Sequence, residues 1–284
     1  MKNSLCDAFQ VRSRSAWRLI SRGQSAGVRA AEETITNLTL MELSLPYRPG
    51  FRIRACSKKE EASLGADWEM WFGGRTGRWL GLRVQAKAID LQSVNFPHLH
   101  YRKKGASLYQ SDTLIRNALA STPALTPVYV LYTYARGALL KTWPCGSYQK
   151  QTSLFGCSLV SAFQIRLLRL KGHKRALADL SDHMLPWHCL VCCNNYSNGS
   201  LAERAASYLS NTLIAGDTGE SILGSPAAEG SLHEEELAQL FEVYRRPRLS
   251  ERAPNYVLSL LSDREPELPD NLSAVLVVHE GDPA

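Results

Sequence analysis

The sequence predicts an α/β protein in which helices pack on a central sheet. Stretches whose apolar residues recur with helical spacing alternate with short β-branched and aromatic runs, and turn residues separate the two kinds of segment. The chain has 284 residues, of which 44% are hydrophobic, so a sizeable core can form and global disorder is excluded. The formal net charge of +6 permits nucleic-acid binding but does not by itself demonstrate it.

Two helices are expected at the N-terminus. Apolar side chains alternate with arginines between residues 9 and 20, and a second apolar face with helical spacing lies between residues 28 and 43. Pro46 and Pro49 end this second element. Residues 1–30 are rich in arginine and nearly free of acid, as in a transit peptide, but we interpret them as a helix with one solvated basic face.

Three strands are expected next, over residues 51–56, 66–72 and 79–89. The first alternates apolar and polar side chains, and the other two are separated by the glycine-rich segment 73–77. A strand, a glycine-rich turn and a second strand predict a β-hairpin.

The remaining elements follow in order: a helix over 109–120, a buried strand over 128–134, a helix over 158–170 and a last buried strand over 187–193. The composition then changes. Helices over 201–213 and 234–244 flank a glycine- and serine-rich loop at 216–230. Residues 262–284 hold six acids against one base and resemble a tail, although 274–278 is strand-like. We therefore expect an N-terminal helix (1–24), an α/β domain (25–200) and a mostly helical, partly flexible C-terminal extension (201–284) with an acidic tail.

The cysteines and the hydropathy pattern suggest a cytoplasmic protein. Seven cysteines at irregular spacings do not suggest a disulfide framework, and a reducing compartment is the simpler interpretation. No apolar run approaches the roughly 20 residues that a membrane helix needs, so no membrane partner is expected. His188-Cys189-x-x-Cys192-Cys193 could indicate zinc, but Cys145 and Cys157 follow no matching spacing, and a buried thiol-bearing strand is the preferred interpretation.

The predicted hairpin carries the residues that suggest chemistry. Alternation along a strand places Gln85 and Lys87 on one face of the third strand, and Asp67 and Glu69 on one face of the second. The hairpin can bring these four side chains onto one surface. A purely structural strand seldom places a lysine inside an apolar stretch such as 84–89.

Metal-assisted phosphodiester hydrolysis requires groups of these kinds. Mg²⁺ prefers oxygen ligands, which the Asp67 carboxylate, the Gln85 amide and the Ala86 carbonyl can supply. The metal would polarise the phosphate, and Lys87 can position the attacking water or neutralise the developing charge. The alternative is that these are ordinary ion-pairing residues, because a D-x₁₇-Q-x-K spacing is weak by itself.

A neutral glutamine is a weaker metal ligand than a glutamate, so a further carboxylate is expected to compensate. Glu69 lies on the suitable strand face. Glu32 and Glu33, on the preceding helix, are the other candidates. Helical spacing places Glu32 on the face of Ile35, toward the sheet, and Glu33 one step around, and the choice between them stays open.

These residues resemble a known family. Gly65-Ala-Asp67 followed by Val84-Gln-Ala-Lys87 looks like the core of PD-(D/E)XK enzymes, in the Q-x-K variant of Mrr-like restriction endonucleases. More narrowly, the chain is similar to the bacterial family DUF6615. The matching segments are EETITNLTLMEL, EEASLGADWEMWF, LRVQAKAID, YQSDTLI and PVYVLYTY, in the expected order within residues 10–195.

The resemblance implies a restriction-endonuclease-like core, with a mixed four- to five-stranded sheet flanked by helices and a bound Mg²⁺ (or Mn²⁺). Asp67 would be the metal carboxylate, Gln85 the second ligand, Lys87 the catalytic lysine and Glu33 (or Glu32) the helix acid. Gln110 would contact the metal site or the DNA backbone.

We therefore expect a metal-dependent endonuclease that acts on DNA, as an effector in bacterial restriction or anti-phage defence. Lys103 and Lys104 are expected to contact the nucleic acid, and a second copy of the chain or a defence-system protein is the expected protein partner. Two alternatives remain: a catalytically idle nuclease fold that binds nucleic acid or a protein, and an interaction protein whose hairpin is purely structural.

Overall fold

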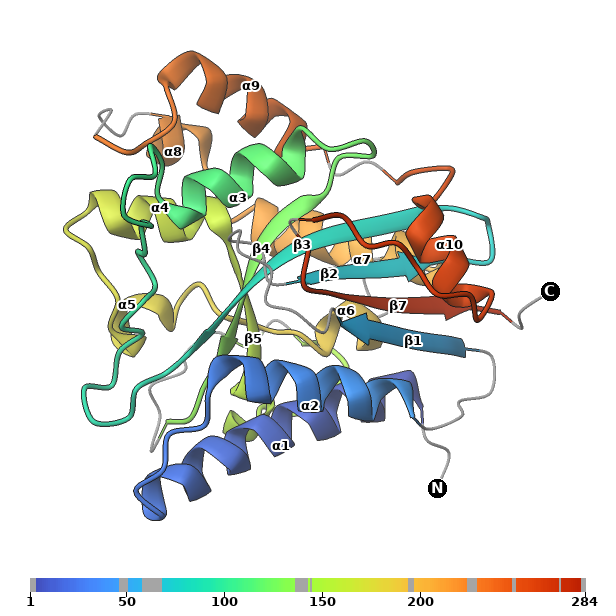
Figure 1. Cartoon of the computed structure of the whole chain (residues 1–284), viewed down its shortest axis with the longest axis horizontal. Coiled ribbons are helices and arrows are strands. Elements are labelled where there is room, and N and C mark those ends of the chain that lie inside the picture. The colour runs from blue at the N-terminus through green and yellow to red at the C-terminus, as the bar shows by residue number, and fades with distance from the viewer. Residues whose placement is uncertain are drawn as a thin grey trace.

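The centre of the molecule is a mixed seven-stranded sheet with the strand order β1-β7-β2-β3-β4-β5-β6 (Figure 1). The computed structural model describes residues 4–45, 51–57, 68–135, 143, 145–193, 197–223, 229–246, 249–270 and 272–281. The strands are β1 (Phe51–Ser57), β2 (Trp68–Gly73), β3 (Trp79–Ala88), β4 (Thr126–Tyr132), β5 (Cys157–Ser161), β6 (Leu185–Pro186) and β7 (Ala274–Glu280). The prediction of an α/β fold is confirmed, but the sheet is larger than the expected four or five strands.

The predicted hairpin is present as β2 and β3, which pair antiparallel from Trp68↔Val84 to Gly73↔Trp79. Gly77 in the connecting turn has φ +74°, a backbone conformation that a residue with a Cβ adopts only with strain. β3 then pairs parallel with β4, and β4 pairs antiparallel with β5. Every residue of β2, β3 and β4 is buried, so the hairpin lies in the interior of the fold.

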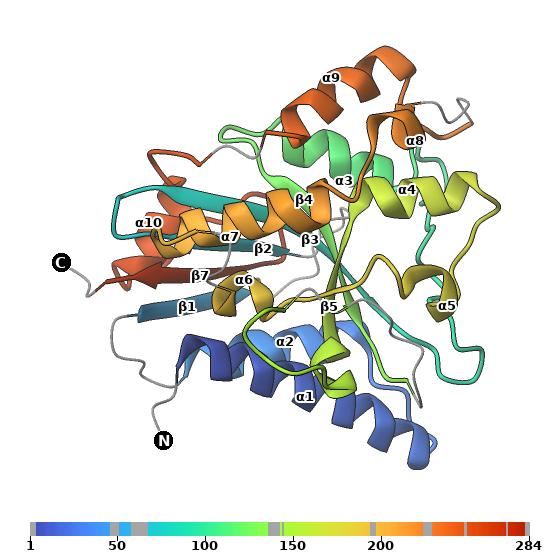
Figure 2. The same cartoon turned by 180° about the vertical axis from the view of Figure 1, so that it is seen from behind.

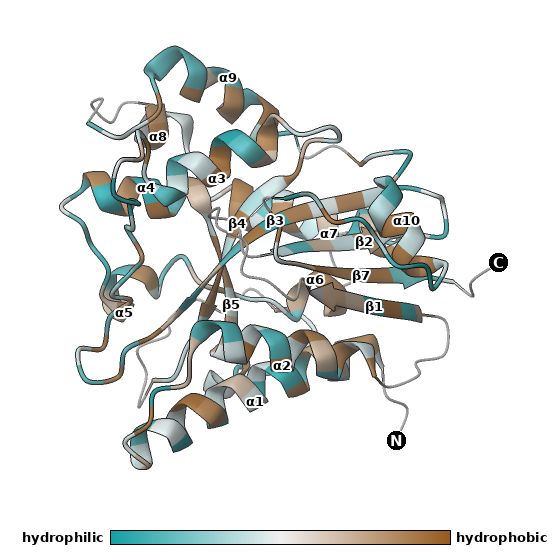
Figure 3. Ribbon diagram, in the orientation of Figure 1, coloured by the Kyte–Doolittle hydropathy of each residue, from teal (hydrophilic) through white to brown (hydrophobic). Residues whose placement is uncertain are grey.

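The last strand of the chain is inserted between two earlier strands. β7 pairs antiparallel with β1 and parallel with β2, so residues 274–280 separate β1 from the hairpin. The segment expected to be an acidic tail therefore contains an internal strand. The cause is its apolar run Ala274–Val278, which is buried on both faces and is coloured hydrophobic along its length in Figure 3.

Helices cover both faces of the sheet. α10 (Asn255–Leu261) packs on β1 and β7 at the front in Figure 1, over a small apolar cluster that includes Trp71, Val257 and Val277. The opposite face belongs to the main core, and α7 (Leu201–Leu209) packs there on β2 and β3 (Figure 2). α1 (Leu5–Ser25) and α2 (Glu32–Ser44) lie side by side along one end of the sheet.

The other helices gather around β4 and β5. α3 (Gln110–Leu119) and α4 (Ala162–Leu170) contact each other and β4, and α9 (Glu234–Tyr244) contacts α3. The shorter elements are η1 (Thr152–Gly156), α5 (Leu177–Leu180), α6 (Cys189–Cys192), the π-helical turn η3 (Ser210–Ile214) that extends α7, and α8 (Gly219–Leu223). The helices expected over 109–120, 201–213 and 234–244 are thus confirmed within a few residues.

Two expected elements are wrong. The helix expected over 158–170 begins as the strand β5 and becomes α4 only at Ala162, because Ser161 caps the helix through a hydrogen bond from the Phe163 N–H (3.1 Å). The strand expected over 187–193 is instead the helical turn α6. Both segments are almost entirely buried, and a short buried run shows no periodicity that separates a strand from a helix.

The structure joins Cys6 of α1 to Cys192 of α6 in a disulfide that the sequence did not predict. The remaining five cysteines are free thiols. Within the described part of the chain, no helix combines the length and the apolar character needed to cross a membrane.

We predict that deleting residues 272–284 abolishes cooperative folding. The deletion removes four buried valine and leucine side chains of β7, each of which contributes about 1.5–3 kcal/mol, and this sum is comparable to the whole stability of a domain. It also exposes the facing edges of β1 and β2. Thermal unfolding followed by circular dichroism measures the effect. Deleting residues 282–284 alone, as the control, should leave the transition intact, and a cooperative transition in the longer deletion would contradict the assigned strand order.

Candidate functional site

Lys87 and Glu32 form an ion pair where β3 ends and α2 begins. The Lys87 Nζ lies 3.2 Å from Glu32 Oε1, and the Ala88 N–H donates a hydrogen bond to Glu32 Oε2 (3.0 Å). The side chain of Lys87 is 8% exposed and that of Glu32 is 25% exposed. Glu32 is the first residue of α2, where the partial positive charge of the helix N-terminus favours a carboxylate.

Of the two acids at the start of α2, Glu32 is the one that contacts Lys87. Glu33, which follows it on the same helix, is exposed to solvent and forms no ion pair with β3 within the described residues. A second contact fixes the helix: the hydroxyls of Thr36 on α2 and Tyr132 on β4 lie 2.8 Å apart in a hydrogen bond. Helical spacing, which placed Glu32 toward the sheet, agrees with these contacts.

Gln85 lies on the same face of β3 as Lys87, two residues earlier, and is buried. Its Nε2 is 3.4 Å from the Ala86 carbonyl oxygen, a long contact. Exposure increases from Gln85 to Lys87 to Glu32, so a substrate would approach this group from the Glu32 end. Asp67, the expected metal carboxylate, directly precedes β2 in the sequence and lies outside the described residues.

Glu69 has a different environment. Its carboxylate is fully buried and accepts hydrogen bonds from Arg83, from Trp71 Nε1 (2.8 Å) and from the Tyr256 hydroxyl (2.6 Å). The pKa of Tyr256 is raised above its usual value, first by burial and then by the adjacent carboxylate. Arg83 precedes Lys87 by four residues, or about 13 Å along a strand. The structure therefore does not bring Glu69 to Lys87, and its oxygens are already engaged.

A cavity of 260 Å³ opens beside the ion pair. Its lining includes Arg29 and Ala30, which shortly precede Glu32, and Ile89 and Asp90, which follow Lys87, but neither member of the pair lines it. The pKa of Asp90 is lowered, mainly by hydrogen bonds from the side chain and backbone of Ser93 and further by the charge of Arg29. Asp90 is thus an additional carboxylate near the end of β3, within the LRVQAKAID segment.

Two basic loops lie side by side beyond β3. The first comprises residues 97–104 and the second residues 171–175, and together we call them the basic surface. The Phe96 N–H donates to the Arg175 carbonyl (3.0 Å), Arg175 donates to the Pro97 carbonyl (3.2 Å), and a ring nitrogen of His100 lies 2.7 Å from the Lys174 carbonyl oxygen. Asp90 forms a β-bridge with Asn95, so the first loop begins within a few residues of the ion pair.

The cations of the basic surface are exposed, and five have no acidic partner among the residues that the structure describes: Lys103, Lys104, Lys171, Lys174 and Arg175. Between the two loops lies a pocket of 210 Å³. Burial is the main cause that lowers the pKa of His100 to about 4, so this imidazole is neutral at pH 7. The positive charge of the surface therefore comes from lysine and arginine.

The expected contact residue Gln110 is half-buried at the start of α3, and its N–H donates to the Tyr101 carbonyl (2.9 Å). The more heavily bonded residue of this segment is Asp112. Its buried carboxylate accepts from Arg166 Nε (3.1 Å), Arg169 (2.8 Å) and the Leu232 N–H (3.0 Å), so it holds α3 to α4 and to residue 232.

Sequence reasoning missed three features of this region: the second basic loop, Asp90, and the hydrogen bond from Tyr256 to Glu69. The run KGHKR at 171–175 is a visible signal, but only the fold places it beside residues 97–104. Tyr256 is 187 residues from Glu69, and no local pattern links the two.

We predict that Glu69→Ala and Glu32→Ala differ strongly in stability. Removing Glu69 leaves the Arg83 charge buried without its partner and should cost about 3–5 kcal/mol of unfolding free energy. Removing Glu32 takes away a carboxylate that is 25% exposed, so water can take its place beside the buried Lys87, and the cost should be smaller, about 1–2 kcal/mol. Urea unfolding measures both. Equal costs would mean that the Lys87–Glu32 pair holds the fold together and is not a candidate functional pair.

The chain was compared with known proteins. No curated protein and no solved structure is significantly similar to it. The model of a family of unknown function, DUF6615, matches residues 5–283, almost the whole chain. The chain therefore belongs to the DUF6615 family.

Proposed function

We propose that the protein is a metal-dependent nuclease of the PD-(D/E)XK type that hydrolyses phosphodiester bonds of DNA. The observation that carries the proposal is the Lys87–Glu32 pair: a lysine inside an apolar strand meets a carboxylate at a helix start, where the site is partly open. A lysine is rarely placed in a sheet interior for structural reasons alone.

The donor atoms near Lys87 are of the kind that Mg²⁺ or Mn²⁺ prefers. Glu32 offers a carboxylate, Gln85 an amide oxygen and Ala86 a carbonyl, and Asp67 precedes the paired strand in the sequence. All of them are oxygen donors, and no soft ligand lies in this set, so the chemistry fits a hard cation. When bound, the metal would supply Lewis-acid polarisation of the phosphate and a more acidic water.

The protein side chains have separate roles in this proposal. The Lys87 ammonium has three donors, of which one is directed to Glu32, and the others can hold a phosphate oxygen or the attacking water. Glu32, fixed by the Ala88 N–H, holds the ammonium in place. Burial of Gln85 and Lys87 lowers the local dielectric and strengthens these interactions with a developing negative charge.

The basic surface supports a polyanionic substrate. Five of its exposed cations have no acidic partner within the described residues, and cations of this kind bind the phosphates of nucleic acid with release of counterions. The loop that carries Lys103 and Lys104 is connected to the end of β3 through the Asp90↔Asn95 bridge. A duplex on this surface would extend toward the ion pair.

Gln85 and the full engagement of Glu69 favour a second candidate, a nuclease fold that binds nucleic acid without cutting it. Both reduce the negative charge that is available to a metal. Salt-sensitive binding without metal-dependent cleavage would support this alternative. A role in bacterial restriction or anti-phage defence, with a second copy or a defence protein as partner, belongs to the same proposal and depends on cleavage being observed.

We predict that the protein cuts plasmid DNA with Mg²⁺ or Mn²⁺, and that Lys87→Ala lowers the rate by about 10²–10³-fold. The reason is the loss of a preorganised cation at the reacting phosphate. Asp67→Ala should have a similar effect. Gel assays of plasmids and oligonucleotides over a metal titration provide the measurement, and cleavage at the wild-type rate in both variants would show that the assigned site is wrong.

Neighbouring acids on α2 provide a matched pair for the same assay. Glu32→Gln should lower cleavage at least about 10-fold because it removes the charge beside Lys87, whereas Glu33→Gln should cut like the wild type. If the two variants lose activity equally, the helix acid does not act through Lys87.

We predict that the basic surface determines the salt dependence of DNA binding. In the double variant Lys103→Ala/Lys104→Ala, the slope of the logarithm of the DNA-binding constant against the logarithm of the salt concentration should become smaller in magnitude by about one for each lost phosphate contact. Lys171→Ala/Lys174→Ala should behave in the same way. Arg245→Ala/Arg246→Ala, which removes two exposed cations from the end of α9, is the control and should leave the slope unchanged. Fluorescence anisotropy with a labelled duplex gives the slopes, and equal slopes in all variants would exclude this surface.

A further inference from the structure

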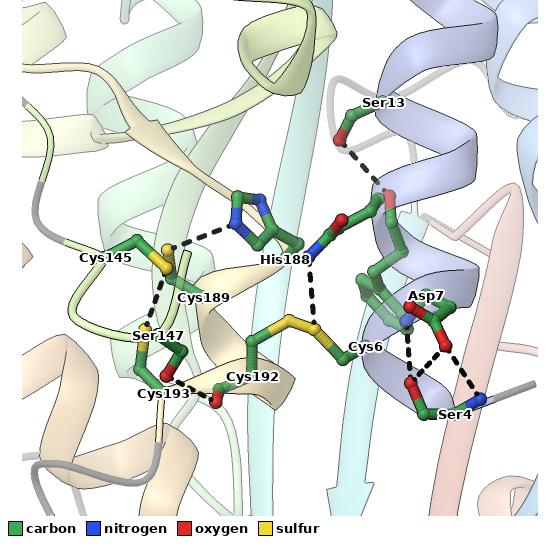
Figure 4. The surroundings of a disulfide bond; sticks show 12 residues. Ser4, Cys6, Asp7, Ser13, Cys145, Ser147, His188, Cys189, Cys192 and Cys193 are labelled. Carbon is green, nitrogen blue, oxygen red and sulfur yellow. Dashed lines mark hydrogen bonds between the residues drawn. A yellow bond between two sulfur atoms is a disulfide. The ribbon is translucent and has the colours of Figure 1, made fainter. Parts of the chain in front are cut away.

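Three thiols and one imidazole meet between the segment around Cys145 and the helical turn α6. Cys145, His188 and Cys189 each place a ligand atom within 4.8 Å of the others, and all three residues are buried. The sulfur of Cys193 lies 3.6 Å from that of Cys145. Figure 4 shows these side chains beside the Cys6–Cys192 disulfide, and we call the four residues the thiol cluster.

Two distances in the thiol cluster match those between the ligands of a tetrahedral zinc ion. With Zn–S bonds of about 2.3 Å and Zn–N bonds of about 2.0–2.1 Å, neighbouring ligand atoms are separated by about 3.5–3.8 Å. Cys145 Sγ and Cys193 Sγ are 3.6 Å apart, and Cys189 Sγ is 3.8 Å from His188 Nε2. We propose that Cys145, His188, Cys189 and Cys193 bind one structural Zn²⁺ ion.

Zinc binding requires the thiols to lose their protons. A cysteine coordinates zinc as the thiolate, so binding of Zn²⁺ by this cluster would release protons and leave three thiolates on the ion.

His188 supplies an independent observation. Its imidazole is fully buried, and Nδ1 has no hydrogen-bond partner in the described parts of the chain. Nε2 faces the Cys189 sulfur, which is a weak hydrogen-bonding group. A buried polar ring with such poor partners is costly. Coordination of a metal by Nε2 would replace this weak contact with a strong bond, and the rings of Trp143 and Tyr148 pack around the imidazole.

The ligand set indicates a structural role. Four protein ligands fill a tetrahedral zinc and leave no position for a substrate. The ion would attach the segment around Cys145 to α6, which is itself joined to α1 by the Cys6–Cys192 disulfide and packs on α7. The Ser147 hydroxyl, which donates to the Cys192 carbonyl (3.2 Å), already links the same two segments. This zinc site is separate from the oxygen-donor site proposed at Lys87.

The first test is the metal content of the untagged full chain, purified without chelators and measured by elemental mass spectrometry. We expect about one zinc per chain. Cys189→Ser should lose the zinc, and a chelator should lower the melting temperature of the wild type but not of this variant. Cys56→Ser, which removes a half-buried thiol of β1, and Cys6→Ser, which removes only the disulfide, are the controls and should both retain the zinc.

A second measurement does not depend on the folding of any variant. Co²⁺ added to the reduced, metal-free wild type should produce sulfur-to-cobalt charge transfer and the visible bands of a tetrahedral ion. The proposal is overturned if the reduced wild type binds neither Zn²⁺ nor Co²⁺. It is also overturned if alkylation without reduction, followed by peptide mass spectrometry, finds Cys145 in a disulfide with Cys189 or Cys193.

Discussion

The pairing of β7 between β1 and β2 is the constraint on which the rest of the structure depends. The β2–β3 hairpin presents Gln85 and Lys87, and without β7 the outer side of β2 would be an unpaired edge. α10 directly precedes β7 in the chain and carries Tyr256, whose hydroxyl bonds to Glu69 on β2. The C-terminal segment therefore completes the sheet. It also covers one end of the row of polar side chains on β3, which consists of Arg83, Gln85 and Lys87.

Two ion pairs in this polar row have similar chemistry but differ in how deeply they are buried. Arg83 and Lys87 lie on one face of β3, and each meets a glutamate from another element. Glu69 is fully buried, and Arg83, Trp71 and Tyr256 together satisfy its oxygens, so this pair is part of the core. Glu32 is a quarter exposed and has room for another partner. The chemistry of the two pairs is alike, and access to solvent makes the second one the candidate site.

The sequence predicted the local features well. Alternation along β3 identified the face of Gln85 and Lys87, and helical spacing on α2 favoured Glu32. The sequence failed where distant segments meet. The strand-like run at 274–278 was visible, but nothing local indicated that it inserts between β1 and β2. The cysteines of the thiol cluster could not be grouped, because Cys145 is 48 residues from Cys193 and the expected strand at 187–193 is a helical turn.

The charges of the proposed nuclease site indicate that metal binding would depend on the presence of the substrate. In the proposal, Asp67 and Glu32 contribute two negative charges, Lys87 cancels one, and Gln85 contributes none. A site with so little net charge attracts a divalent cation weakly when no substrate is present. Mg²⁺ is commonly held by one or two carboxylates together with substrate phosphates, so the phosphate would complete the coordination. The basic surface, connected to the end of β3 through the Asp90↔Asn95 bridge, would raise the local concentration of phosphate at that place. Metal binding and DNA binding are then thermodynamically coupled, and each strengthens the other by the same factor.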